Sequence, residues 1–419
     1  MAKKNIFYAQ SGGVTAVINA SACGVIETAR QHKNELGKVY AGRNGILGAL
    51  KEELIDTSKE SSKAVQALYH TPGGAFGSCR YKLKSLEQNQ REYERLIAVF
   101  AAHNIGYFFY NGGNDSQDTA YKVSQIGEKL GYPITCIGIP KTMDNDLPVT
   151  DNCPGFGSVA KYAAISIQEA SFDVRSMCTS TQVFILEVMG RHAGWVAAAS
   201  GLAAQTEAEG PHIILFPEIT FNKEKFLKQV ADCVKKYDFC AIVASEGIKD
   251  HTGEFVATIA GSVDAFGHKQ LGGTAATLAT IVKDNLGYKI HFAIADYLQR
   301  AARHVVSKTD LEQAYAAGQK AVEFAVKGMN NIMTTIIRKP GKRYSWKIGS
   351  TPLNTVANVE KFMPRDFITK NGFHITNKAR TYLLPLIQGE APPPYKNGLP
   401  DYVTLKNILV PKKLKKFDL

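Results

Sequence analysis

The stretch KTMDND, residues 141–146, places a lysine and two carboxylates within a single short turn. It follows ITCIGIP, an apolar run with the length and composition of a buried strand. A carboxylate such as Asp144 can take a proton from a reacting hydroxyl, and a cation such as Lys141 can neutralise charge that develops on a transferred group. These residue types at the end of a strand indicate a catalytic turn.

Similar turns follow other apolar runs. They contribute Gly12 and Gly13, then Asn114 and Asp115, then Gly190 and Arg191, and finally Glu246. Taken singly, SGG and NGGND are better explained as tight turns, since Gly and Asn tolerate positive φ. Taken together, these turns predict a site for a phosphorylated ligand with a metal ion. The glycines let phosphate approach the backbone, and the carboxylates and cations supply the charges that such a site needs.

Several other motifs are excluded by their details. The DND triplet does not begin an EF-hand, because Val149 stands where that loop requires glycine. The match of PGFGSVA to the dinucleotide fingerprint is weak, because no apolar strand precedes it. The chain has neither a P-loop motif nor an HRD catalytic loop.

The strands and helices that must position these turns alternate along the chain. Strand-like runs occur in NIFYAQ, IGYFFYNG, ITCIGIP, QVFILEVM, HIILFP and FCAIVAS, and helical periodicity occurs in residues 15–29, 116–131 and 223–238. Such alternation predicts an α/β fold with doubly wound, parallel central sheets. In these folds ligands bind at the carboxyl ends of the strands, where the polar turns lie.

The whole chain sets limits on its class. Its 419 residues predict two domains and an extension. Its formal charge of +12 favours anionic partners. Phosphorylated metabolites are enough to account for this charge, so we expect no nucleic-acid partner. Seven cysteines without a C-x-x-C pair indicate a reducing cytoplasm. No apolar run reaches the roughly 18 residues of a membrane span. We therefore expect a cytoplasmic protein with no membrane partner.

In combination the turns are much more specific. SGG, GGND, PKTMDND, MGRHAG, SEG and YLQRAA, in this order, resemble the 6-phosphofructokinase family, and most closely its pyrophosphate-dependent branch. The resemblance covers about the first three quarters of the chain and implies the phosphofructokinase fold. It implies two Rossmann-like domains: residues 1–155, with a return segment at about 300–343, for pyrophosphate, and residues 156–299 for fructose 6-phosphate. Residues 344–419 are expected to form a C-terminal extension.

The resemblance also implies the roles of the catalytic turn. Asp144 would be the general base that accepts the proton of the sugar hydroxyl, with Asp146 in support. Thr142 would contact the transferred phosphoryl group, and Met143 would belong to the substrate-binding set. Phosphoryl transfer depends on such positioning and electrostatics, because its transition state is loose and highly charged.

The choice of donor depends on two positions. Asp115 and Lys141 replace small residues that leave room for a nucleotide's α-phosphate in ATP-using members of the family. A carboxylate there would repel that phosphate, and a lysine can hold the phosphates of a compact donor. By resemblance, Gly12 and Arg80 would also bind pyrophosphate.

The acceptor would be held by residues from the second half of the chain. By resemblance, Met189, Gly190 and Arg191 would contact the sugar phosphate, Glu246 would accept hydrogen bonds from its hydroxyls, and Tyr297 and Arg300 would bind the 6-phosphate.

Two departures from the family pattern leave alternatives open. The acidic residue usually associated with Mg²⁺ is Asn114 here, whose amide oxygen is a weaker ligand, so Asp115 or Asp146 would share the task. The arginine that reaches a neighbouring subunit's sugar phosphate is also missing, and Lys289 and His291 are the candidate replacements. Homodimers or homotetramers are usual in the family.

Three hypotheses follow. The first is a reversible phosphotransferase of glycolysis and gluconeogenesis that uses pyrophosphate, fructose 6-phosphate and Mg²⁺. The second is an ATP-dependent 6-phosphofructokinase, and the third is a non-catalytic protein that binds sugar phosphates.

Overall fold

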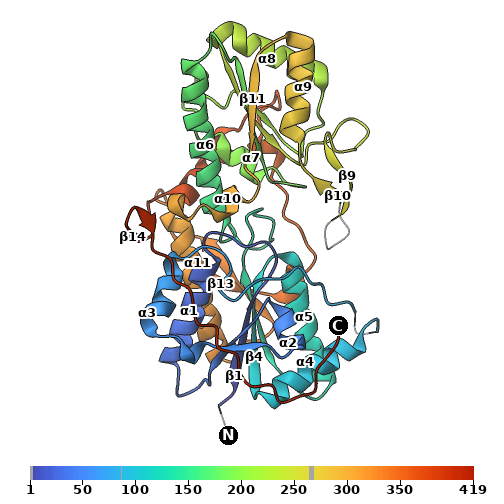
Figure 1. The fold of residues 1–419 in the computed structure, drawn as a ribbon, viewed down its shortest axis with the longest axis vertical. Helices are drawn as coiled ribbons and strands as arrows, with labels where there is room; N and C mark the ends of the chain where they lie inside the picture. The colour runs from blue at the N-terminus through green and yellow to red at the C-terminus, as the bar shows by residue number, and fades with distance from the viewer. Residues whose placement is uncertain (1–2, 86, 264–268) are drawn as a thin grey trace. The chain divides into compact units, whose positions relative to one another are not determined.

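The computed structural model describes residues 3–85, 87–263 and 269–419. The chain divides into two compact units (Figure 1). Unit 1 comprises residues 1–155, 308–360 and 390–419, and unit 2 comprises residues 156–307 and 361–389. Each unit has its own sheet and is described separately.

Unit 1 is built on a seven-stranded sheet with the order β13-β12-β5-β4-β1-β2-β3. The central strands β12, β5, β4, β1 and β2 are parallel, whereas the outer strands β3 and β13 pair antiparallel. The bounds are Asn5–Gln10 (β1), Val39–Gly42 (β2), Leu54–Asp56 (β3), Ile105–Gly112 (β4), Thr135–Pro140 (β5), Ile332–Arg338 (β12) and Trp346–Pro352 (β13).

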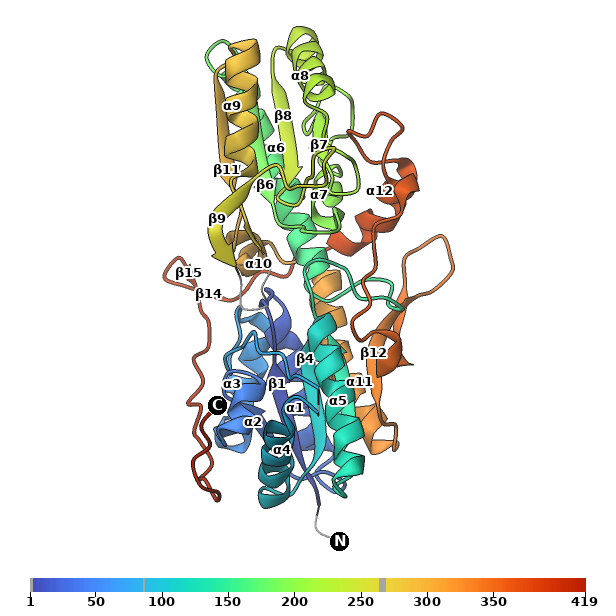
Figure 2. The ribbon, with the colours of Figure 1, turned by 90° about the vertical axis from the view of Figure 1, so that its right-hand side faces the viewer.

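Helices cover both faces of this sheet, as a doubly wound fold requires. On β1, Ile6 and Tyr8 belong to one buried apolar cluster, and Phe7 and Ala9 belong to another. Figures 1 and 2 show α1 running beside α11, and α4 and α5 near β4. The helices span Ile18–Gln31 (α1), Ile46–Leu50 (α2), Ser62–Ala67 (α3), Gln90–Ala102 (α4), Asn114–Lys129 (α5) and Lys308–Val326 (α11).

Unit 2 has a four-stranded, fully parallel sheet with the order β11-β6-β8-β7. Its strands span Val183–Val188 (β6), Ile213–Leu215 (β7), Cys240–Ser245 (β8) and Ile290–Ile294 (β11). Phe226 and Val230 of α8 pack with Ile185 and Ile242 of the sheet in the buried core. The helices span Phe156–Ser176 (α6), Trp195–Ser200 (α7), Lys223–Tyr237 (α8), Thr274–Leu286 (α9), Leu298–Ala301 (α10) and Asn377–Leu383 (α12). A separate antiparallel pair joins β9, Thr258–Val263, to β10, Lys269–Leu271.

The sequence-based division treated residues 344–419 as one extension, and the structure divides them differently. Residues 361–389, including α12, pack in unit 2, and residues 390–419 pack in unit 1. There the chain forms the small hairpin of β14, Tyr395–Lys396, and β15, Leu399–Pro400. The following residues run along β3, where the Val410 N–H donates to the Leu54 carbonyl at 2.7 Å. Within the described part of the chain, no helix is long and apolar enough to cross a membrane.

Candidate active site

The turn at residues 141–146 leaves β5 at the carboxyl edge of the unit 1 sheet. The Lys141 N–H donates to the Gly112 carbonyl at the end of β4, at 3.1 Å. The Asp144 N–H donates to Thr142 Oγ1 at 3.1 Å, and the Thr142 hydroxyl lies 3.5 Å from the Asp144 carboxylate. Asn145 adopts a φ of 55°, in the left-handed region that asparagine tolerates. The turn therefore places the hydroxyl and the carboxylate side by side, with Asp144 only partly buried.

Lys141 connects this turn to the glycine turn after β1. Its side chain is buried, and Nζ donates to the Gly13 carbonyl at 2.5 Å. Gly12 has a φ of 74°, and a Cβ at this position would lie 3.4 Å from Lys141 Nζ. The Gly12 N–H donates to the Cys79 carbonyl at 3.0 Å, next to the exposed Arg80. The structure thus brings together the glycine turn, the lysine and the segment that carries Arg80.

Asn114 and Asp115 lie in the first turn of α5 rather than in a free turn. The positive end of a helix dipole favours anionic groups at this place. The side chain of Asp115 is 43% exposed and forms an ion pair with Lys82, whose Nζ lies 2.7 Å from the carboxylate. Sequence reasoning missed Lys82, although it follows Arg80 by two positions.

Asn114 and Asp146 form the oxygen-rich part of the turn cluster. Asn114 Nδ2 donates to Asp146 Oδ2 at 3.3 Å. Asn114 Oδ1 is buried and accepts no hydrogen bond from the described residues. A buried amide oxygen beside a carboxylate suits a hard cation, which binds oxygen ligands. These two residues fit a divalent metal, and the more exposed Asp115 is engaged by Lys82.

In unit 2, the turns after β6 and β8 are in close contact. Ser245 Oγ donates to the Gly190 carbonyl at 2.5 Å, and the Gly190 N–H donates to Glu246 Oε1 at 3.4 Å. Gly190 has a φ of 148°, and a Cβ there would lie 2.8 Å from the Ala193 carbonyl oxygen. Glycine is therefore required at this position. Met189 and Arg191 flank it and are both partly exposed.

The carboxylate of Glu246 lies in a partly desolvated and acidic environment. Burial raises its pKa above the ordinary value of 4.5, and the nearby charges of Glu187 and Asp296 act in the same direction. The Gly190 N–H and the charge of Arg191 oppose this rise. The result is a hydrogen-bond acceptor that takes up its proton at a higher pH than an ordinary glutamate.

Tyr297 and Arg300 stack at the start of α10, with the Arg300 guanidinium carbon 3.6 Å from the centre of the Tyr297 ring. Between them in sequence, Gln299 Oε1 accepts from the Met189 N–H at 3.3 Å. Gln299 joins α10 to the turn after β6, a connection that the YLQR motif did not reveal by itself. Of the two residues left open, His291 is exposed on β11, and Lys289 Nζ contacts Ser180 Oγ at 3.3 Å.

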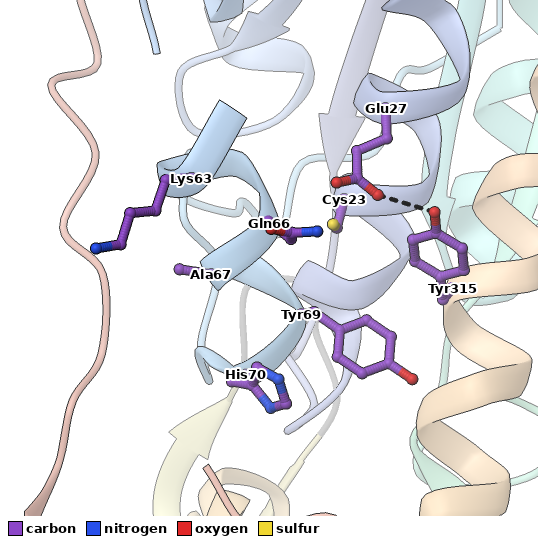
Figure 3. Close-up of a pocket in the computed structure, with 8 residues that line it drawn as sticks. All are labelled: Cys23, Glu27, Lys63, Gln66, Ala67, Tyr69, His70 and Tyr315. Carbon is purple, nitrogen blue, oxygen red and sulfur yellow. Dashed lines mark hydrogen bonds between the residues drawn. The ribbon is translucent and has the colours of Figure 1, made fainter. Parts of the chain in front are cut away.

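A pocket on unit 1 lies apart from these turns. It is lined by residues of α1, α3 and α11 and of the segment after α3, and Tyr315 donates to Glu27 at 2.8 Å within it (Figure 3). None of the residues assigned to the site by sequence lines this pocket.

The site residues therefore form two sets, one in each unit, and most residues of each set lie at the carboxyl ends of parallel strands. The fold and these turns define a class, the doubly wound α/β proteins with glycine-, carboxylate- and cation-bearing turns. A family model described as "Phosphofructokinase" matches residues 5–325, and the chain belongs to this family.

Relatives of known name match the chain over nearly its full length. "Pyrophosphate–fructose 6-phosphate 1-phosphotransferase" of Methylococcus capsulatus is 63% identical over 99% of both chains. The protein of the same name from Halomonas elongata is 61% identical over 100% of both chains. Among solved structures, the pyrophosphate-dependent phosphofructokinase of Marinobacter aquaeolei has a TM-score of 0.91 and 63% identity, covering 99% of this chain and 100% of that one.

Proposed function

We propose that this chain transfers a phosphoryl group from pyrophosphate to the 1-hydroxyl of fructose 6-phosphate. The products are fructose 1,6-bisphosphate and phosphate, and the reaction runs in both directions. The observation that carries the proposal is the pair of donor-selecting residues, with Lys141 buried beside the glycine turn and Asp115 at the start of α5. The full-length identity with relatives of this name supports it.

Asp144 is the proposed general base. Its carboxylate lies beside the Thr142 hydroxyl and is partly exposed, so that a sugar hydroxyl can reach it. As the 1-hydroxyl oxygen bonds to phosphorus, its proton passes to Asp144, and the bond from phosphorus to the bridging oxygen of pyrophosphate breaks. Thr142 and Met143 belong to the same substrate-contacting turn.

The donor is held in unit 1. Lys141 neutralises charge on the transferred group, Arg80 binds the remaining phosphate, and Gly12 contacts pyrophosphate at a position where it has no side chain to obstruct it. Asp115 excludes a nucleotide because its carboxylate would meet the α-phosphate. In this proposal, residues 1–155 with the return segment form the pyrophosphate-binding domain.

Mg²⁺ is the proposed metal, held by Asn114 and Asp146. The buried Oδ1 of Asn114 and the adjacent carboxylate supply the oxygen ligands that this ion prefers. When bound, the ion would offset negative charge on the phosphates.

The acceptor is held by unit 2, residues 156–299 in the main. Arg191, Tyr297 and Arg300 bind its phosphate, with Met189 and Gly190 packed against the sugar, and Glu246 accepts hydrogen bonds from the hydroxyls.

A homodimer or homotetramer is the proposed assembly. β11 is an outer strand of its sheet, and Phe292 and Ile294 on it are each 45% exposed. An exposed apolar strand of this kind favours contact with a second copy of the chain. We place the enzyme in the cytoplasm, in glycolysis and gluconeogenesis, in keeping with its free cysteines.

The test is the rate of fructose 1,6-bisphosphate formation from fructose 6-phosphate and Mg²⁺, with pyrophosphate and ATP as parallel donors. Turnover with pyrophosphate and not with ATP is expected. Turnover with ATP alone would overturn the donor assignment, and turnover with neither would leave only sugar-phosphate binding.

A further inference from the structure

Two cysteines and a histidine meet at the amino end of the unit 2 sheet. Cys233 lies near the carboxyl end of α8, Cys240 begins β8, and His212 precedes β7. Their two sulfur atoms and an imidazole nitrogen all lie within 4.8 Å of one another. Glu246 follows the opposite, carboxyl end of β8, so this cluster is separate from the proposed acceptor residues.

The orientation of the His212 ring defines the tautomer of its neutral form. The Ala241 N–H donates to His212 Nδ1 at 3.0 Å, so the proton of the neutral ring is on Nε2. His212 Nε2 is buried and makes no hydrogen bond within the described part of the chain. A buried N–H donor without an acceptor is costly, and an anion formed nearby would satisfy it.

The two thiols differ in acidity and in exposure. In a cysteine pair that forms a disulfide on oxidation, the attacking cysteine reacts with the oxidant and the resolving cysteine then reacts with the first sulfur. The hydrogen bond with Cys240, opposed by burial and aided by His212, lowers the pKa of the Cys233 thiol. Burial and the neighbouring sulfur raise the pKa of Cys240. Cys233 retains 4% exposure and Cys240 none, so the more acidic thiol is also the more accessible one.

A metal site is a poorer explanation of the same cluster. A neutral imidazole that binds a metal through Nε2 carries its proton on Nδ1 and donates it to an acceptor. Here His212 Nδ1 faces the Ala241 N–H, which is a donor. Binding through Nδ1 would instead displace that hydrogen bond. The orientation of the ring thus suits a thiolate better than a metal ion.

We propose that Cys233 and Cys240 are a site of reversible oxidation by hydroperoxides. The Cys233 thiolate attacks one peroxide oxygen, giving a sulfenic acid and releasing hydroxide or alkoxide, which takes up a proton. The Cys240 thiol then attacks the Cys233 sulfur, forming the disulfide and releasing water. Two electrons pass from the two thiols to the peroxide, and a dithiol reductant returns them.

The experiment treats the full-length protein with stoichiometric hydrogen peroxide, blocks free thiols by alkylation at timed intervals and maps the peptides by mass spectrometry. A disulfide linking Cys233 to Cys240 should form first and disappear with dithiothreitol. Cys79 and Cys178 are more exposed and serve as internal controls. Oxidation of Cys178 or Cys79 before the pair would overturn the proposal, because exposure alone would then decide reactivity.

Two variants test the separate roles. Cys240→Ser should leave Cys233 as a sulfenic acid that dimedone traps, whereas an unmodified Cys233 would overturn the attacking role. His212→Phe keeps an aromatic ring between Tyr237 and Phe239, which both contact the native imidazole, and should slow disulfide formation several-fold. An unchanged rate in a variant with native near-ultraviolet circular dichroism would remove His212 from the proposal.

Metal binding is the competing outcome, and it has its own readout. The reduced protein, stripped with a chelator and titrated with Zn²⁺, should show no stoichiometric binding that depends on Cys233. Tight binding lost in Cys233→Ser would overturn the oxidation site in favour of a metal site.

Discussion

Lys82 Nζ lies 2.7 Å from the carboxylate of Asp115, and both side chains are about half exposed, at 48% and 43%. The lysine therefore offsets the negative charge of the very residue that we propose excludes a nucleotide. Pyrophosphate is itself highly anionic, so an uncompensated carboxylate would repel the wanted donor as well as the unwanted one. The ion pair lets Asp115 act by occupying space while its charge is partly neutralised.

Replacing Lys82 should therefore weaken donor binding. Exposed ion pairs contribute roughly 0.2–1 kcal/mol, so Lys82→Met should raise the KM for pyrophosphate by up to about fivefold with little change in kcat. Initial rates at varied pyrophosphate concentration measure this effect. Lys84→Met, an exposed lysine of the same segment, is the matched control. If Lys82 acts through Asp115, its replacement should have no further effect in an Asp115→Gly background; an undiminished effect there would contradict this mechanism.

Removal of the proposed base should affect the chemical step. Asp144→Asn keeps the size of the side chain and its place beside Thr142 but cannot accept the proton. We expect kcat to fall by about 10²–10⁴-fold with a modest change in KM, as is typical of general-base catalysis. Asp151→Asn is the control, because Asp151 follows in the same segment and pairs with Arg338 at 3.1 Å. Near-normal turnover of Asp144→Asn would exclude the assigned role.

The donor preference should change when both selecting residues are removed. Asp115→Gly combined with Lys141→Gly deletes the carboxylate proposed to exclude the α-phosphate and the lysine proposed to neutralise the compact donor. Pyrophosphate-dependent kcat/KM should fall, and ATP should gain measurable turnover. The two donors are compared at equal Mg²⁺ excess. Unchanged pyrophosphate kinetics would show that neither residue selects the donor.

Much of the fold could be predicted because its strands carry strong local signals. Apolar runs ending in polar turns predicted β1, β4, β5, β6, β7 and β8, and the parallel, doubly wound class is confirmed. The helical pattern of residues 223–238 corresponds to α8, Lys223–Tyr237. These strands and helices are buried on one or both sides. The spacing of apolar residues along them therefore follows the packing of each element, and this spacing can be recognised in the sequence.

What the sequence did not reveal depends on tertiary contacts. The helix α12 was missed, because its seven residues are too few for periodicity to identify them. Lys82 and Gln299 were missed since their partners, Asp115 and Met189, are distant in the chain. The assigned roles of Asp144, Arg191 and the other site residues stay predictions.

The raised pKa of Glu246 predicts a pH-dependent affinity for the sugar phosphate. The ionised carboxylate accepts hydrogen bonds at both oxygens, whereas protonation turns one oxygen into a donor and weakens acceptance from sugar hydroxyls; burial raises the pKa at which this happens. The KM for fructose 6-phosphate should therefore rise as the pH falls toward that raised pKa. The phosphate ester titrates at mildly acidic pH too, so Glu246→Gln provides the reference profile. The wild type should show the steeper rise, and parallel profiles would count against Glu246 as an acceptor.

Glu52 is a buried carboxylate that holds the C-terminal segment on unit 1. It accepts from the backbone N–H groups of Lys413 and Leu414 at 2.6 and 3.1 Å, and it lies 2.7 Å from His103 Nε2. Burial alone would raise its pKa, but the Lys413 N–H, His103 and the Leu414 N–H outweigh burial and lower it. The ionised form is thus the one that the folded state stabilises.

The sign of the resulting pH dependence follows from linkage. Because the folded-state pKa is lowered, this stabilisation is present above the ordinary pKa of 4.5 and is lost as the pH falls through the lowered value. Glu52→Gln leaves buried donors without a charged acceptor and should cost roughly 3 kcal/mol of unfolding free energy at neutral pH. Thermal unfolding between pH 7 and the acid range measures it, and the gap between variant and wild type should narrow as the pH falls.

The same variant should also release the C-terminal segment, because its backbone donors lose their anchor. Limited proteolysis should then cleave among the lysines of residues 412–416 well before it does so in the wild type. Glu53→Gln, at the adjacent position, is the control for the loss of a carboxylate outside this contact. Equal cleavage rates for Glu52→Gln and wild type would show that the apolar packing of Leu414 and Phe417 on the unit 1 core holds the segment without the carboxylate.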